Sequence, residues 1–241
     1  MSIAENLHRV RERIARAAES AGRTADDITL VGVTKYVGPR KAAELTTAGC
    51  IDLGESRPQE LWKKVGEVAS ATGSPASTPT IRWHLIGHLQ RNKVARTLPL
   101  VSLIHSIDSE RLLAAINDAR AATGDNQPPT NVLLEVNTSG ELAKQGLSPD
   151  AVEPLLDAAP RYPHVEIRGL MTMAALEGGP TVAAQNFALL RELRDRLKPN
   201  APSCVTLEDL SMGMSGDFEA AIREGATIVR IGSALWEEEK T

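Results

Sequence analysis

Lys35 is the residue whose type and position most directly suggest chemistry in this chain. It follows the first apolar, β-branched run, residues 28–33, as the middle residue of Thr34-Lys35-Tyr36. A lysine amine attacks carbonyl carbons only when it is neutral, and partial removal from water favours that form. On its own the position fits an exposed loop lysine better, so a second feature has to give it a role.

Two glycine- and serine-rich segments near the C-terminus supply that second feature. Residues 211–217 follow an apolar run and open a helical pattern, and residues 230–233 follow the last apolar run. Glycines leave backbone N–H groups open, and such groups bind phosphate at the start of a helix. Two simple turns, with Ser215 as a helix cap, would give the same pattern. Together the segments favour a phosphate site, and with Lys35 they predict a phosphorylated aldehyde as the ligand.

Other polar groups follow apolar runs without being specific alone. They include Gly54-Glu55-Ser56 and the segments 135–139 and 169–173. His84 and His88 are four residues apart, a spacing that a metal pair can use. However, His84 falls inside an expected strand and His88 beyond it, and no third ligand accompanies them. We therefore expect structural or ligand-shell roles and no metal site.

The elements that position these residues alternate regularly along the chain. Apolar, β-branched runs predict strands at 28–33, 50–53, 81–86, 101–107, 132–136, 165–171, 205–210 and 227–231. Helical patterns lie at 39–48, 59–68, 91–97, 109–122, 149–158, 181–197 and 218–224. Ahead of them all, residues 1–22 form an amphipathic helical pattern that Ser2 can cap.

This alternation predicts parallel βαβ units, and eight of them in 241 residues predict a single (β/α)8 TIM barrel with an extra N-terminal helix. We expect one domain over residues 1–241, with a flexible loop at 70–80. An open doubly wound sheet is the alternative, although no Gly-x-Gly-x-x-Gly follows the first strand. In a closed barrel the first and last strands are neighbours, which brings Lys35 beside the two glycine-rich segments.

Composition excludes several classes of protein. The net charge is −4 with no basic tract, and aromatic residues make up 3%, which argues against nucleic-acid binding. Cys50 and Cys204 form neither a disulfide framework nor a zinc pattern. No stretch approaches the roughly 20 apolar residues of a membrane span, and the N-terminus lacks a secretory signal. We expect a cytoplasmic protein, and a monomer, with no membrane partner.

These residues also carry a family resemblance that covers nearly the whole chain. The chain resembles the pyridoxal phosphate homeostasis proteins. The shared motifs are Val33-Thr34-Lys35, Leu53-Gly54-Glu55, Trp83-His84-Leu85-Ile86-Gly87 with Leu89-Gln90 and Asn92-Lys93, His105-Ser106-Ile107-Asp108, Arg168-Gly169-Leu170-Met171, Leu210-Ser211-Met212-Gly213-Met214-Ser215 and Val229-Arg230-Ile231-Gly232-Ser233.

The resemblance implies a barrel related to the N-terminal domain of alanine racemase, with pyridoxal 5′-phosphate (PLP) held as an internal aldimine on Lys35. It implies that Ser215, Gly232 and Ser233 hold the phosphate and that Arg230 lies near the pyridine nitrogen. A cation there disfavours ring protonation and weakens the ring as an electron sink. The cofactor-binding candidates are Lys35, Ser56, Met214, Ser215, Arg230, Gly232 and Ser233.

Two positions depart from the family pattern. Ser56, followed by Arg57-Pro58, stands where the family has Asn after Gly-Glu, which puts any contact of that amide in question. Leu235-Trp236-Glu237 follows the last strand in place of the usual Phe-Gly. Neither change touches the lysine or the phosphate segments.

The resemblance implies a protein that stores, buffers or delivers PLP, with PLP-dependent apo-enzymes as recipients and at most weak turnover. An amino-acid racemase of the alanine racemase type is the alternative. Racemization needs acid and base groups on both faces of the substrate. In the related racemases a tyrosine from a second domain serves the second face, whereas Tyr36 and Tyr162 are the only tyrosines here. A Schiff-base aldolase for a phosphorylated sugar is a third reading.

Overall fold

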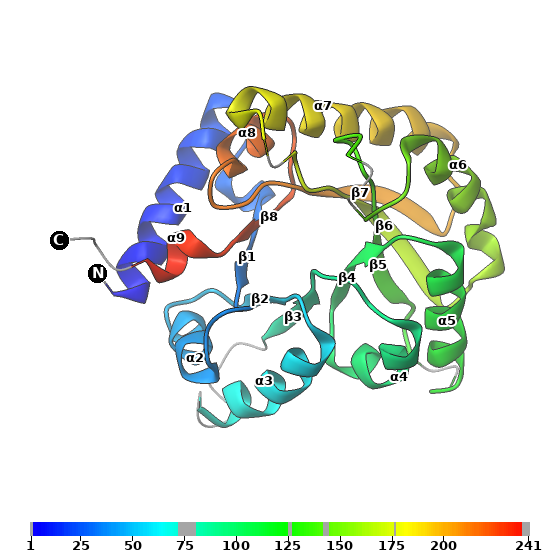
Figure 1. Ribbon diagram of the computed structural model, residues 1–241, viewed down its shortest axis with the longest axis horizontal. Helices are drawn as coiled ribbons and strands as arrows, with labels where there is room; N and C mark the ends of the chain where they lie inside the picture. Colours follow the sequence, from blue (N-terminus) through cyan, green and yellow to red (C-terminus); the bar gives the residue numbers. More distant parts are fainter. Residues whose placement is uncertain (1, 72–80, 125–126, 142–144, 176, 238–241) are drawn as a thin grey trace.

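The architecture is a closed barrel of parallel strands, seen nearly end-on in Figure 1. It comes from a computed structural model that describes residues 2–71, 81–124, 127–141, 145–175 and 177–237. In that part of the chain eight strands follow one another around the barrel, and β1 closes on β8. The strands are β1 (Thr29–Val33), β2 (Asp52–Glu55), β3 (Arg82–Leu85), β4 (Leu103–Ile107), β5 (Thr130–Glu135), β6 (Val165–Met171), β7 (Val205–Ser211) and β8 (Ile228–Ile231). The predicted (β/α)8 barrel is confirmed.

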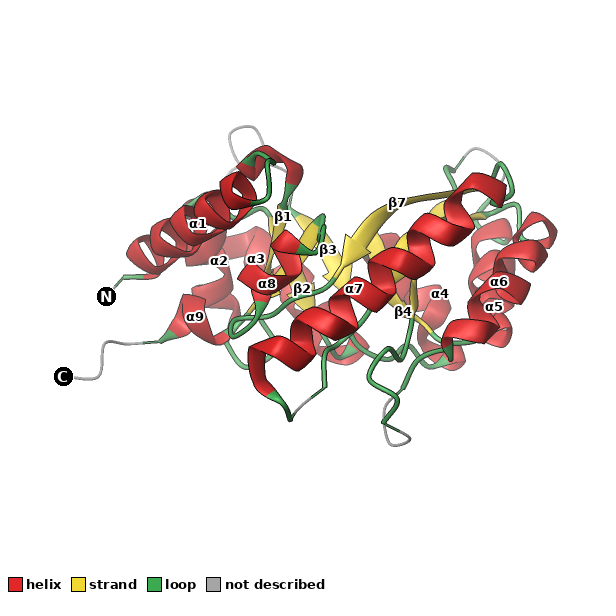
Figure 2. Cartoon of the chain, turned by 90° about the horizontal axis from the view of Figure 1, so that it is seen from above, coloured by secondary structure: helices red, strands yellow, loops and turns green. Residues whose placement is uncertain are grey.

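Helices surround the barrel and connect the strands (Figures 1 and 2). The α-helices are α1 (Ile3–Ser20), α2 (Pro39–Thr47), α3 (Pro58–Ala71), α4 (Val94–Thr97), α5 (Glu110–Ala121), α6 (Pro149–Ala158), α7 (Gly179–Leu197), α8 (Phe218–Arg223) and α9 (Ser233–Trp236). Short 3-10 turns are η1 (Ala25–Asp27), η2 (Arg91–Lys93), η3 (Leu98–Leu100), η4 (Ala159–Arg161) and η5 (Lys198–Asn200). Seven expected connecting helices are found, and α9 is an addition that no periodicity predicted.

The extra N-terminal helix α1 is present and packs on the outside of the barrel against α8 and α9 (Figure 1). Ser2 caps it, and the Glu5 side chain accepts a hydrogen bond from the Ser2 backbone N–H, as the sequence predicted. Its apolar stripe, which includes Leu7, Val10 and Ile14, is buried within the chain. The apolar face of α1 is therefore used internally.

Side chains on each strand alternate between the barrel interior and the helical layer, as the two-residue period of a strand requires. The outward apolar residues pack on the helices in one large core. Inside the barrel a smaller apolar cluster is formed by Val31, Leu103, Leu133, Met171 and Ile228. Several other inward positions carry polar or charged side chains, so the barrel interior is partly polar.

Strand β2 is displaced toward its C-terminal end relative to the prediction of 50–53, since it runs on through Gly54 and Glu55. Glu55 is fully buried, which apolar patterning cannot anticipate for a carboxylate. Of the expected loop at 70–80, Ser70 and Ala71 belong to α3 and residues 72–80 lie outside the described part of the chain. Among the described helices, none combines the length and apolar character needed to cross a membrane.

Gly169 in β6 gives a direct test of this packing. A Cβ atom built there overlaps the backbone carbonyl of Asp209 in β7, whereas one built at Gly66 in α3 meets nothing within 4 Å. We expect Gly169→Ala to lower the free energy of unfolding by about 1–3 kcal/mol or more, because neighbouring backbone must move. Gly66→Ala should raise it by about 0.5–1 kcal/mol. Urea titrations of the two variants measure both, and equal effects would contradict the β6–β7 register.

Candidate cofactor site

A cavity of about 780 Å³ opens at the C-terminal ends of the strands, where barrel active sites lie. Its lining residues are Val33, Lys35, Tyr36, Val37, Ser56, Ile86, Gly87, Met173, Met214, Ser215, Gly216, Arg230, Gly232, Ser233, Trp236 and Glu237. All seven candidate residues from the sequence are in this set. The fold therefore brings together side chains that are up to about 200 positions apart along the chain, as Lys35 and Ser233 show.

The segments after β7 and β8 are tied to each other by hydrogen bonds. The backbone N–H of Arg230 donates to the Gly213 carbonyl at 3.0 Å. The N–H groups of Gly232 and Ala234 donate to Ser215 Oγ at 3.1 and 3.4 Å. Gly213 adopts a φ of +92°, a conformation that favours glycine, and lies tightly against α8. These bonds hold the two segments as a single unit.

This unit also contains backbone N–H groups that donate to no protein acceptor among the described residues. Among the described residues, the backbone N–H groups of Ser215, Gly216 and Ser233 have no protein acceptor, although all three residues line the cavity. Unpaired backbone N–H groups converging on one place form an anion site. The arrangement fits a phosphate group, and the α9 turn that helps to build it was not predicted.

Arg230 is a buried cation in the cavity wall, with 4% of its surface exposed. Its Nη1 donates to Ser211 Oγ at 2.6 Å and its Nη2 donates to the Thr172 carbonyl at 2.9 Å. Burial lowers its pKa to about 10, against the attraction of Glu135 and Asp217. The guanidinium therefore stays charged at neutral pH and is held in one orientation.

Lys35 is exposed at the cavity, and its Nζ lies 4.9 Å from the centroid of the Tyr36 ring. This exposure agrees with the position of Lys35 in a loop after the first strand. Lys35 and Tyr36 lie beyond the end of β1, and Tyr36 itself is 80% exposed. The amine is consequently open to an aldehyde that arrives from solution.

Behind Lys35 lies a buried ion pair that sequence reasoning missed. Lys64 on α3 donates from Nζ to Glu55 Oε2 at 2.5 Å and to the Thr34 carbonyl at 2.6 Å. Glu55 Oε1 accepts the Ser56 N–H at 2.8 Å. The pair thus holds the backbone immediately before Lys35 and at Ser56, both at the cavity. Two sequence features could have predicted this ion pair: a Glu directly before Ser56, and a lysine that interrupts the apolar face of the following helix.

Trp236 is a second contributor that the sequence did not assign. Its Nε1 donates to the Val33 carbonyl at 2.9 Å, which joins α9 to the end of β1. It lines the cavity together with Ile86 and Met173, so much of the wall is apolar. The sequence flagged Trp236 only as a departure from the family pattern. Its contact shows what the departure does: it covers the end of β1 beside Lys35.

His84 and His88 are separated, as expected. His84 points into the barrel and contacts His105 and Asp52, while His88 pairs with Asp108 at 3.3 Å. Within the described ranges no group of three or more His, Cys, Asp or Glu side chains is arranged to hold a metal ion. The site chemistry is thus that of an amine, an anion-binding turn and a buried guanidinium.

The buried pair yields a stability prediction. Lys64→Met leaves Glu55 buried without its cation, which costs about 3–5 kcal/mol of the free energy of unfolding. The neighbouring Lys63 makes a surface pair with Glu60 at 3.2 Å, and its side chain is 67% exposed. Lys63→Met should therefore change stability by about 1 kcal/mol or less. Chemical denaturation of both variants checks this, and similar losses in the two would refute a structural role for Lys64.

Comparison with known proteins places the chain in a family. The family model described as "Alanine racemase, N-terminal domain" matches residues 5–239. The "Pyridoxal phosphate homeostasis protein" of Aquifex aeolicus is 40% identical over 240 residues, which cover 100% of both chains. The protein of the same name from Pseudomonas aeruginosa is 37% identical, over 98% of this chain and 95% of its own.

Solved structures agree with the sequence relatives. The structure of PipY from Synechococcus elongatus "with PLP bound" superposes with a TM-score of 0.83 at 30% identity, over 98% of this chain and 100% of that one. Identity at this level over complete chains reflects common ancestry as well as common fold. The chain therefore belongs to the family of the pyridoxal phosphate homeostasis proteins, among the barrels that match the alanine racemase N-terminal domain.

Proposed function

We propose that this protein binds pyridoxal 5′-phosphate reversibly and serves intracellular PLP homeostasis by storing, buffering or delivering the cofactor. The observation that carries the proposal is the convergence on one cavity of an accessible amine, unpaired phosphate-binding N–H groups and a buried cation. Each suits one part of PLP: the aldehyde, the phosphate and the pyridine nitrogen. The relatives named for PLP homeostasis and the PLP-bound PipY support the same function.

The candidate residues take distinct parts in this proposal. The Nζ atom of Lys35 adds to the aldehyde carbon of PLP, and a water molecule leaves as the carbon–nitrogen double bond forms. Ser215, Gly232 and Ser233 hold the phosphate, and Arg230 faces the ring nitrogen. Ser56 and Met214 are the remaining candidates and belong to the cavity wall. A guanidinium at the ring nitrogen disfavours ring protonation, which suits binding better than carbanion chemistry.

Racemase activity is less well supported by the cavity. The Tyr36 ring lies on the same side as the Lys35 amine, 4.9 Å from it, and is exposed. The hydroxyl of Tyr162 donates to Glu110, and Tyr162 is not among the cavity residues. Neither tyrosine therefore stands across the cavity from Lys35. A sugar aldolase is disfavoured because Val33, Ile86, Met173 and Trp236 offer apolar walls that suit an aromatic ring.

The open rim suits transfer of the cofactor. Tyr36, Met173 and Met214 are large apolar side chains with 80%, 40% and 40% of their surface exposed, and all three line the cavity. We propose that a monomer presents this rim to PLP-dependent apo-enzymes in the cytoplasm. We further propose that residues 1–241 act as one domain. Binding rather than turnover is the proposed activity.

One spectroscopic experiment tests the function. Purified protein incubated with PLP should develop a visible absorption band, and borohydride should abolish it while attaching the cofactor to Lys35, as peptide mass spectrometry would show. Lys35→Ala should lose both signals because, among the described residues that line the cavity, Lys35 alone offers an amine. Lys41→Ala, which removes an exposed lysine of α2, should keep both. A wild-type protein that takes up no PLP would refute the proposal. If the wild-type protein racemizes alanine and Lys35→Ala does not, the racemase function is favoured instead.

A further inference from the structure

A line of buried polar side chains runs through the barrel beneath the cavity. Starting from Arg230, whose Nη1 lies 2.6 Å from Ser211 Oγ, the line continues from Ser211 Oγ to His105 Nδ1 at 2.8 Å. His105 Nε2 lies 2.9 Å from His84 Nδ1, and His84 Nε2 lies 3.0 Å from Asp52 Oδ1. Each of these five residues is at least 93% buried. The function proposed above uses only Arg230.

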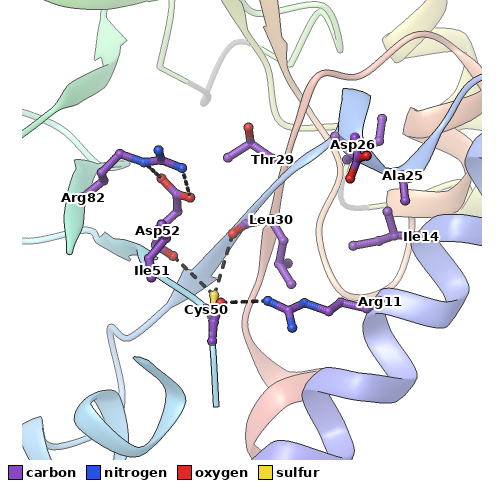
Figure 3. A pocket seen from close by; sticks show the side chains of 12 residues that line it. Arg11, Ile14, Ala25, Asp26, Thr29, Leu30, Cys50, Ile51, Asp52 and Arg82 are labelled. Atoms are coloured by element: carbon purple, nitrogen blue, oxygen red, sulfur yellow. Dashed lines mark hydrogen bonds and ion pairs between the residues drawn. The ribbon is translucent and has the colours of Figure 1, made fainter. Parts of the chain in front are cut away.

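The line connects opposite ends of the barrel. Arg230 lines the cavity at the C-terminal ends of the strands, whereas Asp52 and His84 line a hollow of about 280 Å³ at the N-terminal ends. Arg82 closes the line there, with its Nε and Nη2 each 2.6 Å from a carboxylate oxygen of Asp52. Figure 3 shows this pair of bonds beside a second hollow at the same end. The line thus begins at the cation Arg230 and ends at the ion pair of Asp52 with Arg82.

The chemistry of the two ends determines the direction of every bond between them. Arg230 can only donate, so Ser211 Oγ accepts from it and directs its own proton to His105 Nδ1. His105 must then carry its proton on Nε2 and donate to His84 Nδ1. His84 in turn carries its proton on Nε2 and donates to the Asp52 carboxylate. In this order each polar hydrogen along the line has an acceptor, and both histidines are neutral.

The opposite assignment of protons along the line is less favourable for two reasons. If His105 carried its proton on Nδ1, then Ser211 Oγ would accept twice, and among the described residues its hydroxyl has no other acceptor. His84 would then need two protons to satisfy both His105 and Asp52. That cation would sit in the same buried line as Arg230. Burial, and then the proximity of His84 and Arg230, already hold the pKa of His105 well below its ordinary value.

We infer that Ser211, His105, His84 and Asp52 are positioning residues for the cofactor, acting through this one-directional line to hold the Arg230 guanidinium at the ring nitrogen. This inference rests on the proposed function, since it gives Arg230 a cofactor ring to face. The line matters because, among the described residues, two acceptors fix the Arg230 side chain: Ser211 Oγ and the Thr172 carbonyl. Without Ser211 the guanidinium loses one of two fixed acceptors and can turn.

The direction of the bonds can be measured without any cofactor or variant. The chain has only five histidines, so their ring ¹⁵N resonances can be assigned in the intact protein. Nitrogen chemical shifts distinguish a protonated from a bare ring nitrogen. The expected result is that both His84 and His105 are neutral and carry the proton on Nε2. Finding His105 protonated on Nδ1, or either ring charged at neutral pH, would overturn the inference.

The positioning role is tested by the rate at which bound PLP leaves. Ser211→Ala removes the hydroxyl that links Arg230 to His105, and PLP should dissociate about tenfold faster because a hydrogen bond to a charged group is lost. The visible band should also shift as the ring environment changes. Thr46→Val is the matched control, since it removes a buried hydroxyl of α2 that bonds only to the Ala43 carbonyl. Equal dissociation rates and spectra in the two variants would refute the role.

A double-mutant cycle separates a connected line from a local effect. Asp52→Asn, four hydrogen bonds from Arg230, should speed dissociation a few-fold alone and add nothing in the Ser211→Ala background, because the line is already broken there. If the double variant instead shows the product of the two separate increases in dissociation rate, the two sites act independently and the inference is overturned. A wild-type protein that binds no PLP would defeat the proposed function instead, and the nitrogen shifts would still decide the direction of the line.

Discussion

Burial of the Arg230 guanidinium inside the barrel is the constraint on which the polar interior depends. A charge removed from water needs fixed partners, since an unpaired one costs several kcal/mol. Arg230 finds them in Ser211 and in the Thr172 carbonyl, and the attraction of Glu135 and Asp217 adds to them. Ser211 can accept from Arg230 only if its own proton has a destination, which His105 supplies. A single buried cation thereby explains why polar side chains occupy positions that barrels commonly fill with aliphatic ones.

The far end of that interior is stabilised in the same way. Burial opposes ionisation of Asp52, but hydrogen bonds from His84 and Arg82 outweigh it and leave the pKa of the carboxyl lowered. Asp52 can therefore remain an anion at the N-terminal ends of the strands. The positive end of the line, Arg230, lies toward the cavity, and the negative end lies toward Asp52. Cation and anion are separated by neutral donors and acceptors, which satisfies both charges without placing them in contact.

Hydrogen bonds from buried side chains also fix the cavity wall around Lys35. The lysine itself is exposed and free to react, whereas the backbone that carries it is fixed by a second, buried lysine. Lys64 and Glu55 hold the Thr34 carbonyl and the Ser56 N–H, and Trp236 holds the Val33 carbonyl. An exposed amine on a fixed backbone suits the proposed reversible binding of an aldehyde. The segments after β7 and β8 are also fixed, because hydrogen bonds join them to each other.

Much of this follows from the sequence alone. The alternation of β-branched runs with helical patterns determined the barrel, since strands and helices have different apolar periods and eight such units close a sheet. The glycine-rich segments and Lys35 each follow a predicted strand. Residues that follow parallel strands lie at the same end of a barrel, so the sequence predicts that they share one site. Tertiary structure alone decided the α9 turn, the Lys64–Glu55 pair and the line from Arg230 to Asp52. These depend on which polar side chains meet, from 9 residues apart for Lys64 and Glu55 to 106 for His105 and Ser211. Local periodicity reports only which face of an element is apolar, not which polar side chains contact each other.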